Sequence, residues 1–282
     1  MKRTLPHVFL TGASGFVGRH LAYSLIQRGY AVTALVRNVK KASSLDMLAK
    51  ARLVSFDLSR PEHVIDIPRS VLFHAAWDNL REVASPVHIE RHFMDHYRFL
   101  KAAIDQGIGK LIVTGTLSEY GKTFGPVTSN TPTNPNSPYG LAKDFLHKSL
   151  RQLQKTRPYA LIWARLFYLY GDGQDEHCIV PQFDKALESG AKSFNMSFGE
   201  QLLDYLPVGL AAEQLASLMD ARDGVYNVCS GRPTALRLFL ERRMEGQGKK
   251  IHLNLGAYPY RDEDSLAIWG ADPVGVSDQP TN

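Results

Sequence analysis

The sequence predicts an α/β protein with a doubly wound parallel sheet and a smaller C-terminal region. Short apolar runs alternate with amphipathic helical patterns over the first 170 residues, as expected when helices cover both faces of a parallel sheet. A glycine-rich turn directly follows the first apolar run. The alternation weakens after about residue 171, so we expect a first domain over residues 1–170 and a second region over residues 171–282.

The predicted strands are short apolar runs bounded by polar residues. Residues 7–10, 30–36, 53–56, 71–74, 111–114 and 160–167 provide six strands, and residues 225–228 provide a short one in the second region. This region is therefore expected to return in part to the sheet. It is also expected to cover the carboxyl edge of the sheet, where ligands of such folds bind.

The predicted helices carry apolar residues at helical spacing. Val17, Leu21 and Leu25 share one face of a helix that stops at Gly29, because glycine tolerates the backbone that ends a helix. Residues 122–138 are rich in Pro, Asn, Ser and Thr and are predicted to form a loop, and the last thirty residues show no periodicity. Further helices are expected at residues 89–106, 139–153, 181–189 and 211–221.

Composition and charge argue against several classes of protein. The net charge of +5 is dispersed, without the interleaved basic and aromatic residues typical of single-strand binders. No apolar run approaches the ~20 residues that cross a membrane, and the N-terminal apolar stretch is too short for a signal peptide. Two cysteines and no zinc-like spacing indicate neither a disulfide framework nor a metal site. We expect a cytoplasmic protein without nucleic-acid, membrane or metal partners.

The turn at residues 11–18 reads Thr-Gly-Ala-Ser-Gly-Phe-Val-Gly. The spacing G-x-x-G-x-x-G between a strand and a helix is typical of a Rossmann-type dinucleotide site. There the glycines allow a tight turn, close approach of the pyrophosphate and close packing of helix on strand. Amides at the helix N-terminus then face the phosphates. The predicted pyrophosphate contacts are Gly12, Ser14, Gly15, Phe16, Val17 and Gly18.

The residues after the second and third strands bear on which dinucleotide is bound. The second strand leads into Arg37 rather than a carboxylate. A guanidinium can hold a 2′-phosphate in a bidentate contact that an acid would repel, so we favour NADP(H), with NAD as second choice. The alternative is that Arg37 is a solvated loop charge. Asp57 is placed to accept a hydrogen bond from the adenine amino group, or alternatively to cap a strand end.

A tyrosine and a lysine with suitable spacing provide candidate catalytic groups. Tyr139 and Lys143 lie four residues apart on one face of a predicted helix. Free tyrosine has a pKa of ~10, and a nearby ammonium group lowers it by favouring the phenolate. Thr116 follows the fifth strand and is placed to bind the same substrate oxygen. The three residues therefore predict proton transfer at a carbonyl or carbinol.

Taken together, these motifs resemble the extended short-chain dehydrogenase/reductase family, which contains NAD-dependent epimerases and dehydratases of nucleotide sugars. The resemblance implies Thr116 in the usual Ser/Thr role, Tyr139 as acid/base and Lys143 as a ribose ligand that lowers the tyrosine pKa. The motifs lie at residues 11–18, 74–76, 114–116, 120–121, 139–143, 165–167 and 170–171. Further cofactor contacts are expected at Leu58, His74, Ala75, Ala76, Thr114, Tyr139, Lys143 and Phe167. Substrate contacts are expected at Trp77, Tyr120, Tyr168 and His177.

Several positions depart from the family pattern. Residues 92–96 stand where the family often has a helical Asn that supports a proton relay. Leu117 and Ser118 replace the Asp-Glu pair of the dehydratases, which argues against elimination of water. Leu203 stands where many members have an arginine for the nucleotide diphosphate, and Tyr168 replaces a common Asn. The sequence thus constrains the type of reaction more than the identity of the substrate.

These observations favour a reductase of a nucleotide-linked 4-keto sugar, which uses NADPH and takes its proton from Tyr139. The first alternative is a nucleotide-sugar epimerase that keeps NAD tightly bound. The second is a non-catalytic NAD(P)-binding sensor, although Thr116, Tyr139 and Lys143 argue against it. By analogy with the family, we expect a homodimer formed through the helices at residues 89–106 and 139–153.

Overall fold

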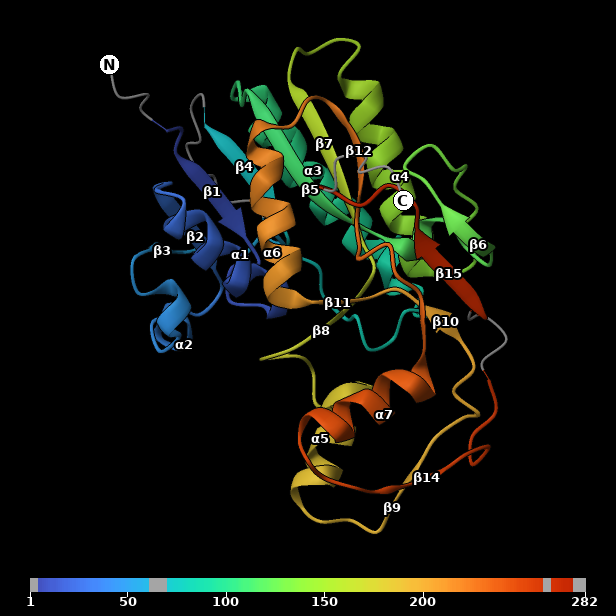
Figure 1. Ribbon diagram of the computed structural model, residues 1–282. Coiled ribbons are helices and arrows are strands. Elements are labelled where there is room, and N and C mark those ends of the chain that lie inside the picture. The colour runs from blue at the N-terminus through green and yellow to red at the C-terminus, as the bar shows by residue number, and fades with distance from the viewer. Residues whose placement is uncertain (1–4, 61–69, 261–264, 276–282) are drawn as a thin grey trace.

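The computed structural model describes residues 5–60, 70–260 and 265–275 of the chain. Within them, seven strands form one parallel sheet in the order β12-β7-β5-β4-β1-β2-β3 (Figure 1). These strands are β1 (Val8–Thr11), β2 (Val32–Val36), β3 (Arg52–Ser55), β4 (Val71–His74), β5 (Lys110–Thr116), β7 (Ala160–Leu166) and β12 (Gly224–Val228). The predicted fold class is confirmed, and β12 returns to the sheet as expected.

The order of the strands reverses at β1. The chain runs outward from β1 through β2 to β3, and then returns to place β4 on the other side of β1. In open α/β sheets, ligands bind at such a switch point, outside the carboxyl ends of the strands. The turn after β1, the turn after β2 and the segment after β4 therefore face one common crevice.

Helices cover both faces of the sheet (Figure 1). Leu21 and Leu25 of the first helix pack with Leu215 on one face, and Leu100 and Leu146 pack together on the other. The predicted helix at residues 89–106 begins as a short π-helical segment, His88–His92. The four helices are α1 (Phe16–Gln27) and α6 (Val208–Ser217) on one face, and α3 (Phe93–Asp105) and α4 (Pro138–Leu153) on the other.

The prediction of an uninterrupted loop at residues 122–138 is wrong, because this segment contains strand β6 (Phe124–Val127). Its partner is β15 (Ala267–Gly270), in the part of the chain that shows no periodicity. β6 lies at the edge of a small sheet, where Pro126 is tolerated because an edge strand has one unpaired side. The other strands of this sheet are β10 (Leu202–Leu203) and β13 (Thr234–Ala235).

A smaller lobe lies at the bottom of Figure 1 and is formed by segments on both sides of β12 in the sequence. Its core includes Phe183, Leu187, Met196 and Leu240. Helix α7 was not predicted from the sequence. The elements of this lobe are α5 (Ile179–Glu188), β9 (Ser193–Asn195), α7 (Leu236–Gly246) and β14 (His252–Asn254), and β8 (Tyr168–Tyr170) pairs with β11 (Tyr205–Pro207) beside it. Among the described residues, no helix has the length and apolar character needed to span a bilayer.

A buried carboxylate joins the small sheet to the end of β12. Asp204, between β10 and β11, is completely buried. It accepts hydrogen bonds from the amide and hydroxyl of Ser230, at 2.7 and 2.5 Å, and from the amides of Gly231 and Gly270, at 2.9 and 3.2 Å. Because a buried charge requires such partners, Asp204 fixes three segments that are distant in sequence.

Replacement of Asp204 by alanine should therefore destabilise the fold strongly. We expect Asp204→Ala to lower the free energy of unfolding by about 3 kcal/mol, because it strands several buried donors. Ser230→Ala is the matched control, with an expected loss of about 1 kcal/mol. Urea unfolding measures both, and equal losses in the two variants would contradict a central role for the carboxylate.

Candidate cofactor and catalytic site

The glycine turn after β1 is shaped by backbone contacts that exclude a side chain. Gly12 has a φ of +71°, and a Cβ placed there would lie 2.7 Å from backbone atoms of Ala75. A Cβ on Gly18 would lie only 2.0 Å from the carbonyl oxygen of Gly12. The amide of Gly15 donates to that same oxygen at 2.9 Å. The turn thus has the close packing that the sequence predicts for two of its glycines.

The turn also fits a pyrophosphate. Gly15 is the N-cap of α1 and provides no side chain to cap the first helical amides. Such amides need an acceptor, and the positive end of the helix dipole favours an anion. Because α1 has twelve residues and begins at the switch point of the sheet, the described residues suit a dinucleotide cofactor.

The segments predicted to bind the adenosine end of the cofactor contain charges of both signs. Arg37 donates from Nη1 and Nη2 to the two carboxylate oxygens of Asp78, each at 2.9 Å. Asp57 accepts hydrogen bonds from the amide and hydroxyl of Ser59, at 3.0 and 2.7 Å. The Ser59 hydroxyl is the main reason that the pKa of Asp57 is lowered, and Arg37 lowers it further. Arg37 is thus already ion-paired, which the sequence did not predict.

Lys143 is buried at the centre of the site, with 1% of its surface exposed. Its Nζ donates to the carbonyl oxygen of Thr114 at 2.7 Å and lies 4.2 Å from the ring centre of Trp77. Burial lowers the pKa of Lys143 to about 7, because desolvation disfavours a cation. A carbonyl dipole and the face of an indole are its direct contacts, and the charge of Glu119 also favours the cation.

Tyr139 lies one turn before Lys143, near the start of α4. Ser137 is the N-cap of this helix and accepts from the amide of Gly140, and proline occupies the first helical position, as is common at helix starts. Burial raises the pKa of Tyr139, whereas a hydrogen bond with Thr116 lowers it. The structure therefore brings Thr116 and Tyr139 together, as the sequence predicts.

Two buried histidines hold Trp77, the residue that packs against Lys143. His74 is completely buried and hydrogen-bonded to the Thr11 hydroxyl, at 2.8 Å, and to His96, at 2.7 Å. The ring of His96 stacks on Trp77 with 4.2 Å between ring centres. Burial lowers the pKa of His74 to about 3 and that of His96 well below its usual value. Both imidazoles are therefore neutral, and they add no charge beside Lys143.

Trp77 is also held on its other side. Its Nε1 donates to Nδ1 of His88 at 3.1 Å, so the remaining imidazole proton is on Nε2 and donates to the carbonyl oxygen of Glu82, also at 3.1 Å. The ring of Tyr139 lies 5.9 Å from that of Trp77. These contacts show that Trp77 is a packing residue that orients Lys143. Its predicted contact with substrate stays a prediction.

A buried ion pair positions the segment that carries Thr116, and sequence reasoning missed it. Glu119 is completely buried and accepts from the amide of Thr116 at 2.8 Å, from Trp163 at 2.9 Å and from Arg165 at 2.8 Å. Arg165 lies directly opposite Gly115 in the pairing of β5 with β7. A charged residue near the end of each neighbouring strand was the available signal.

The predicted substrate residues have different environments. Tyr120 is buried, and its hydroxyl lies 2.6 Å from the side-chain oxygen of Asn227. This hydroxyl already has a buried partner, and the predicted contact of Tyr120 with substrate stays a prediction. Tyr168 packs against Tyr205. His177 is exposed and hydrogen-bonded to Asp175 at 3.0 Å, so it remains accessible to a ligand.

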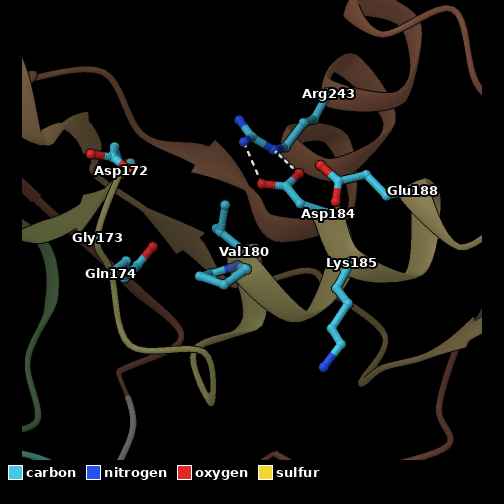
Figure 2. A pocket seen from close by; sticks show the side chains of 10 residues that line it. Asp172, Gly173, Gln174, Val180, Asp184, Lys185, Glu188 and Arg243 are labelled. Atoms are coloured by element: carbon cyan, nitrogen blue, oxygen red, sulfur yellow. Dashed lines mark hydrogen bonds and ion pairs between the residues drawn. The ribbon is translucent and has the colours of Figure 1, made fainter.

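A pocket of about 470 Å³ lies beside the loop that follows β8. Figure 2 shows Arg243, from α7, directed toward Asp184, from α5; the paired atoms are 2.5 Å apart. Asp172 and Gln174 of the loop line the opposite side. The lining does not include the catalytic candidates. It is formed by Gly171, Asp172, Gly173, Gln174, Val180, Pro181, Asp184, Lys185, Glu188 and Arg243.

Comparison with known proteins agrees with this geometry. Residues 8–229 match the model of the NAD dependent epimerase/dehydratase family. The chain belongs to this family. It is an NAD(P)-dependent enzyme of the extended short-chain dehydrogenase type, as the motifs indicated.

Individual relatives carry nucleotide-sugar names. The dTDP-6-deoxy-L-talose 4-dehydrogenase (NAD(+)) of Aggregatibacter actinomycetemcomitans is 31% identical over 94% of this chain and 99% of that protein. The CDP-abequose synthase of Salmonella typhimurium is 26% identical over 92% of this chain and 88% of that protein. The UDP-N-acetylglucosamine 4-epimerase of Methanobrevibacter ruminantium has a similar structure, with a TM-score of 0.84, 22% identity and coverage of 99% of this chain and 94% of that chain.

The lowered pKa of Lys143 predicts a pH-dependent effect on stability. The pKa of Lys143 is about 7 in the folded protein, whereas the ordinary value for a lysine, expected in the unfolded chain, is 10.5. Between these pH values the unfolded chain therefore binds more protons than the folded protein. Stability therefore rises with pH across this window, and the cost of burying the cation is fully present below it. We expect Lys143→Met to raise the Tm of the protein near pH 6, and to raise it less near about pH 10.

Thermal unfolding at the two pH values measures this difference. Lys185→Met, which removes an exposed lysine from α5, is the control and should show little dependence on pH. A Tm difference between Lys143→Met and wild type that stays constant with pH would contradict a depressed lysine pKa.

Proposed function

We propose that this enzyme is an NAD(P)-dependent oxidoreductase that acts at C4 of a nucleotide-linked sugar, reducing a 4-keto group or oxidising the corresponding hydroxyl. The observation that carries the proposal is the hydrogen-bonded pair of Thr116 and Tyr139 beside a buried Lys143, at the carboxyl edge of the sheet. The relative named as a 4-dehydrogenase supports C4 as the reacting carbon, since it aligns over nearly its full length.

The residues of the chain would transfer the proton and bind the substrate oxygen. The nicotinamide of the bound cofactor supplies or accepts the hydride. The hydroxyls of Thr116 and Tyr139 would both hydrogen-bond the oxygen on C4. Because burial raises the pKa of Tyr139, its phenol keeps its proton near neutral pH and suits the role of donor during reduction. In the oxidising direction, the charge of Lys143 would favour the phenolate that removes the proton.

Elimination of water is not part of the proposal. That reaction needs an acid and a base near the sugar in addition to Tyr139, and Leu117 and Ser118 supply neither. Glu119 is the carboxylate closest in sequence, but it is buried between Arg165 and Trp163. A carboxylate committed to these partners cannot reach a substrate proton.

The substrate proposed is a nucleoside-diphosphate 6-deoxysugar, as in the name of the 31% identical relative. Leu203 lies in β10, where the family often has an arginine for the diphosphate, so this chain must bind the diphosphate with other groups. The exposed His177 is one candidate. Epimerisation at C4 is the second candidate function, because several relatives at 22 to 26% identity are named 4-epimerases.

The cofactor, the assembly and the location remain proposals as well. Arg37 supports NADP(H), whereas the name of the 4-dehydrogenase specifies NAD(+). For the proposed homodimer, α3 and α4 lie on the same face of the sheet, where Phe93 and Phe145 pack edge to face and Phe145 is 41% exposed. A cytoplasmic location is proposed from the sequence alone.

Loss of the Tyr139 hydroxyl should abolish turnover without affecting cofactor binding. For oxidation of dTDP-6-deoxy-L-talose, we expect Tyr139→Phe to lower kcat by ~10²–10⁴-fold. The Kd of the oxidised cofactor should change little, because the hydroxyl serves the substrate oxygen. The assay follows the appearance of reduced nicotinamide by absorbance.

Tyr226→Phe is the matched control, because its hydroxyl bonds only the backbone of Arg222 among the described contacts. It should retain wild-type kcat. Near wild-type turnover in Tyr139→Phe would exclude the phenol as the proton-transfer group. No turnover of this sugar by the wild type, in either direction, would refute the proposed substrate.

A further inference from the structure

The ion pair between Arg37 and Asp78 spans the cofactor crevice. Arg37 follows β2, and Asp78 follows β4 by four residues. In the sheet, β2 and β4 are the two neighbours of β1. The pair therefore joins the two segments that flank the glycine turn, at the switch point where the sheet binds its ligand.

The position of Asp78 is fixed by the residues around it. The backbone of Ala75 touches the glycine turn so closely that Gly12 can have no side chain. Trp77, the next residue but one, covers Lys143 and stacks on His96. Because Ala75 and Trp77 are both packed, the segment that leads into Asp78 is anchored, and its carboxylate lies on Arg37, beside the end of β2.

Asp78 accepts hydrogen bonds from the same N–H groups of Arg37 that a 2′-phosphate would need. Its two oxygens accept from Nη1 and Nη2, each at 2.9 Å. A phosphate is held by arginine through the same planar pair of N–H groups. Asp57 adds a second carboxylate within electrostatic range of this guanidinium. A 2′-phosphate would therefore have to displace one acid and approach another.

The pair can nevertheless open. The side chains of Arg37 and Asp78 are 66% and 57% exposed, so water can solvate either charge when they separate. Exposed ion pairs contribute little net free energy and are screened by salt. The competition between Asp78 and a phosphate is therefore close to balance, and a change of one charge can shift it.

We propose that Asp78 is a cofactor-specificity residue, which holds the guanidinium edge of Arg37 and so lowers the preference for NADP(H) over NAD(H) that Arg37 alone would create. This inference rests on the NAD(P)-dependent function proposed above. It reconciles an arginine at the end of β2 with a relative whose name specifies NAD(+). The chain would accordingly accept both cofactors.

Direct binding of NADPH and NADH tests the proposal. Calorimetric titration of wild type and Asp78→Asn gives the Kd of each cofactor without any turnover. We expect Asp78→Asn to tighten NADPH binding by roughly 3- to 10-fold, because Arg37 becomes available for a bidentate contact. NADH binding should change by less than about 2-fold, because its ribose carries no phosphate for Arg37 to bind.

A double-mutant cycle identifies Arg37 as the mediator. Arg37→Gln should weaken NADPH binding, and Asp78→Asn should have no further effect in that background. Asp105→Asn is the matched control: it removes an acid that pairs with Lys101 and Arg157 at the end of α3. It should leave both Kd values unchanged.

Three outcomes would overturn the proposal. An unchanged ratio of the NADPH and NADH Kd values in Asp78→Asn would make the pair an ordinary surface contact. Weaker NADH binding with unchanged NADPH would mean that Asp78 serves the ribose itself. Failure of the wild type to bind either cofactor would refute both this inference and the proposed function, whereas the first two outcomes leave the function intact.

Discussion

A buried cation is the constraint on which the site depends. Lys143 has almost no contact with solvent, and its ammonium group is held by one carbonyl oxygen and the face of Trp77. Such a group is tolerated only where its partners are fixed. The stack of Trp77 on His96, and the neutral bond from His96 to His74, supply that rigidity. The stabilising contacts of the lysine thus run back into the centre of the sheet.

The same segment after β4 serves both ends of the crevice. Ala75 packs against the glycine turn, Trp77 against Lys143 and Asp78 against Arg37. A shift of this short stretch would therefore affect phosphate binding, proton transfer and cofactor choice together. This explains why the residues after β4 are packed by aromatic rings, although such connections are usually more mobile.

The parts of the fold that were predicted from the sequence are those with local signals. Strands β1 to β5, β7 and β12 and helices α1, α3 and α4 have strong apolar patterns, and the glycine turn has a fixed spacing. Strand β6 could not be found this way, because its partner β15 lies far along the chain and its own sequence is Phe-Gly-Pro-Val. Helix α7 was also missed from the sequence, because its apolar face is short and is buried by α5.

The candidate site likewise contains residues that could be predicted from the sequence and pairs that could not. Tyr139 and Lys143 share a helix, so their spacing was visible in the sequence. The bond of Glu119 to Arg165 joins the helical turn after β5 to strand β7, and that of Arg37 to Asp78 joins two loops. Pairs of this kind depend on which segments the sheet places side by side, and the sequence of either segment alone carries no trace of the other.

Isotope transfer tests the central claim, that this site oxidises or reduces C4, most directly. dTDP-6-deoxy-L-talose that carries deuterium at C4 would be incubated with each oxidised cofactor, and the label would be measured by mass spectrometry. The account predicts that the deuterium appears in the reduced nicotinamide, in an amount equal to the keto sugar formed. Deuterium retained on a sugar with inverted C4, and no net cofactor reduction, would contradict it.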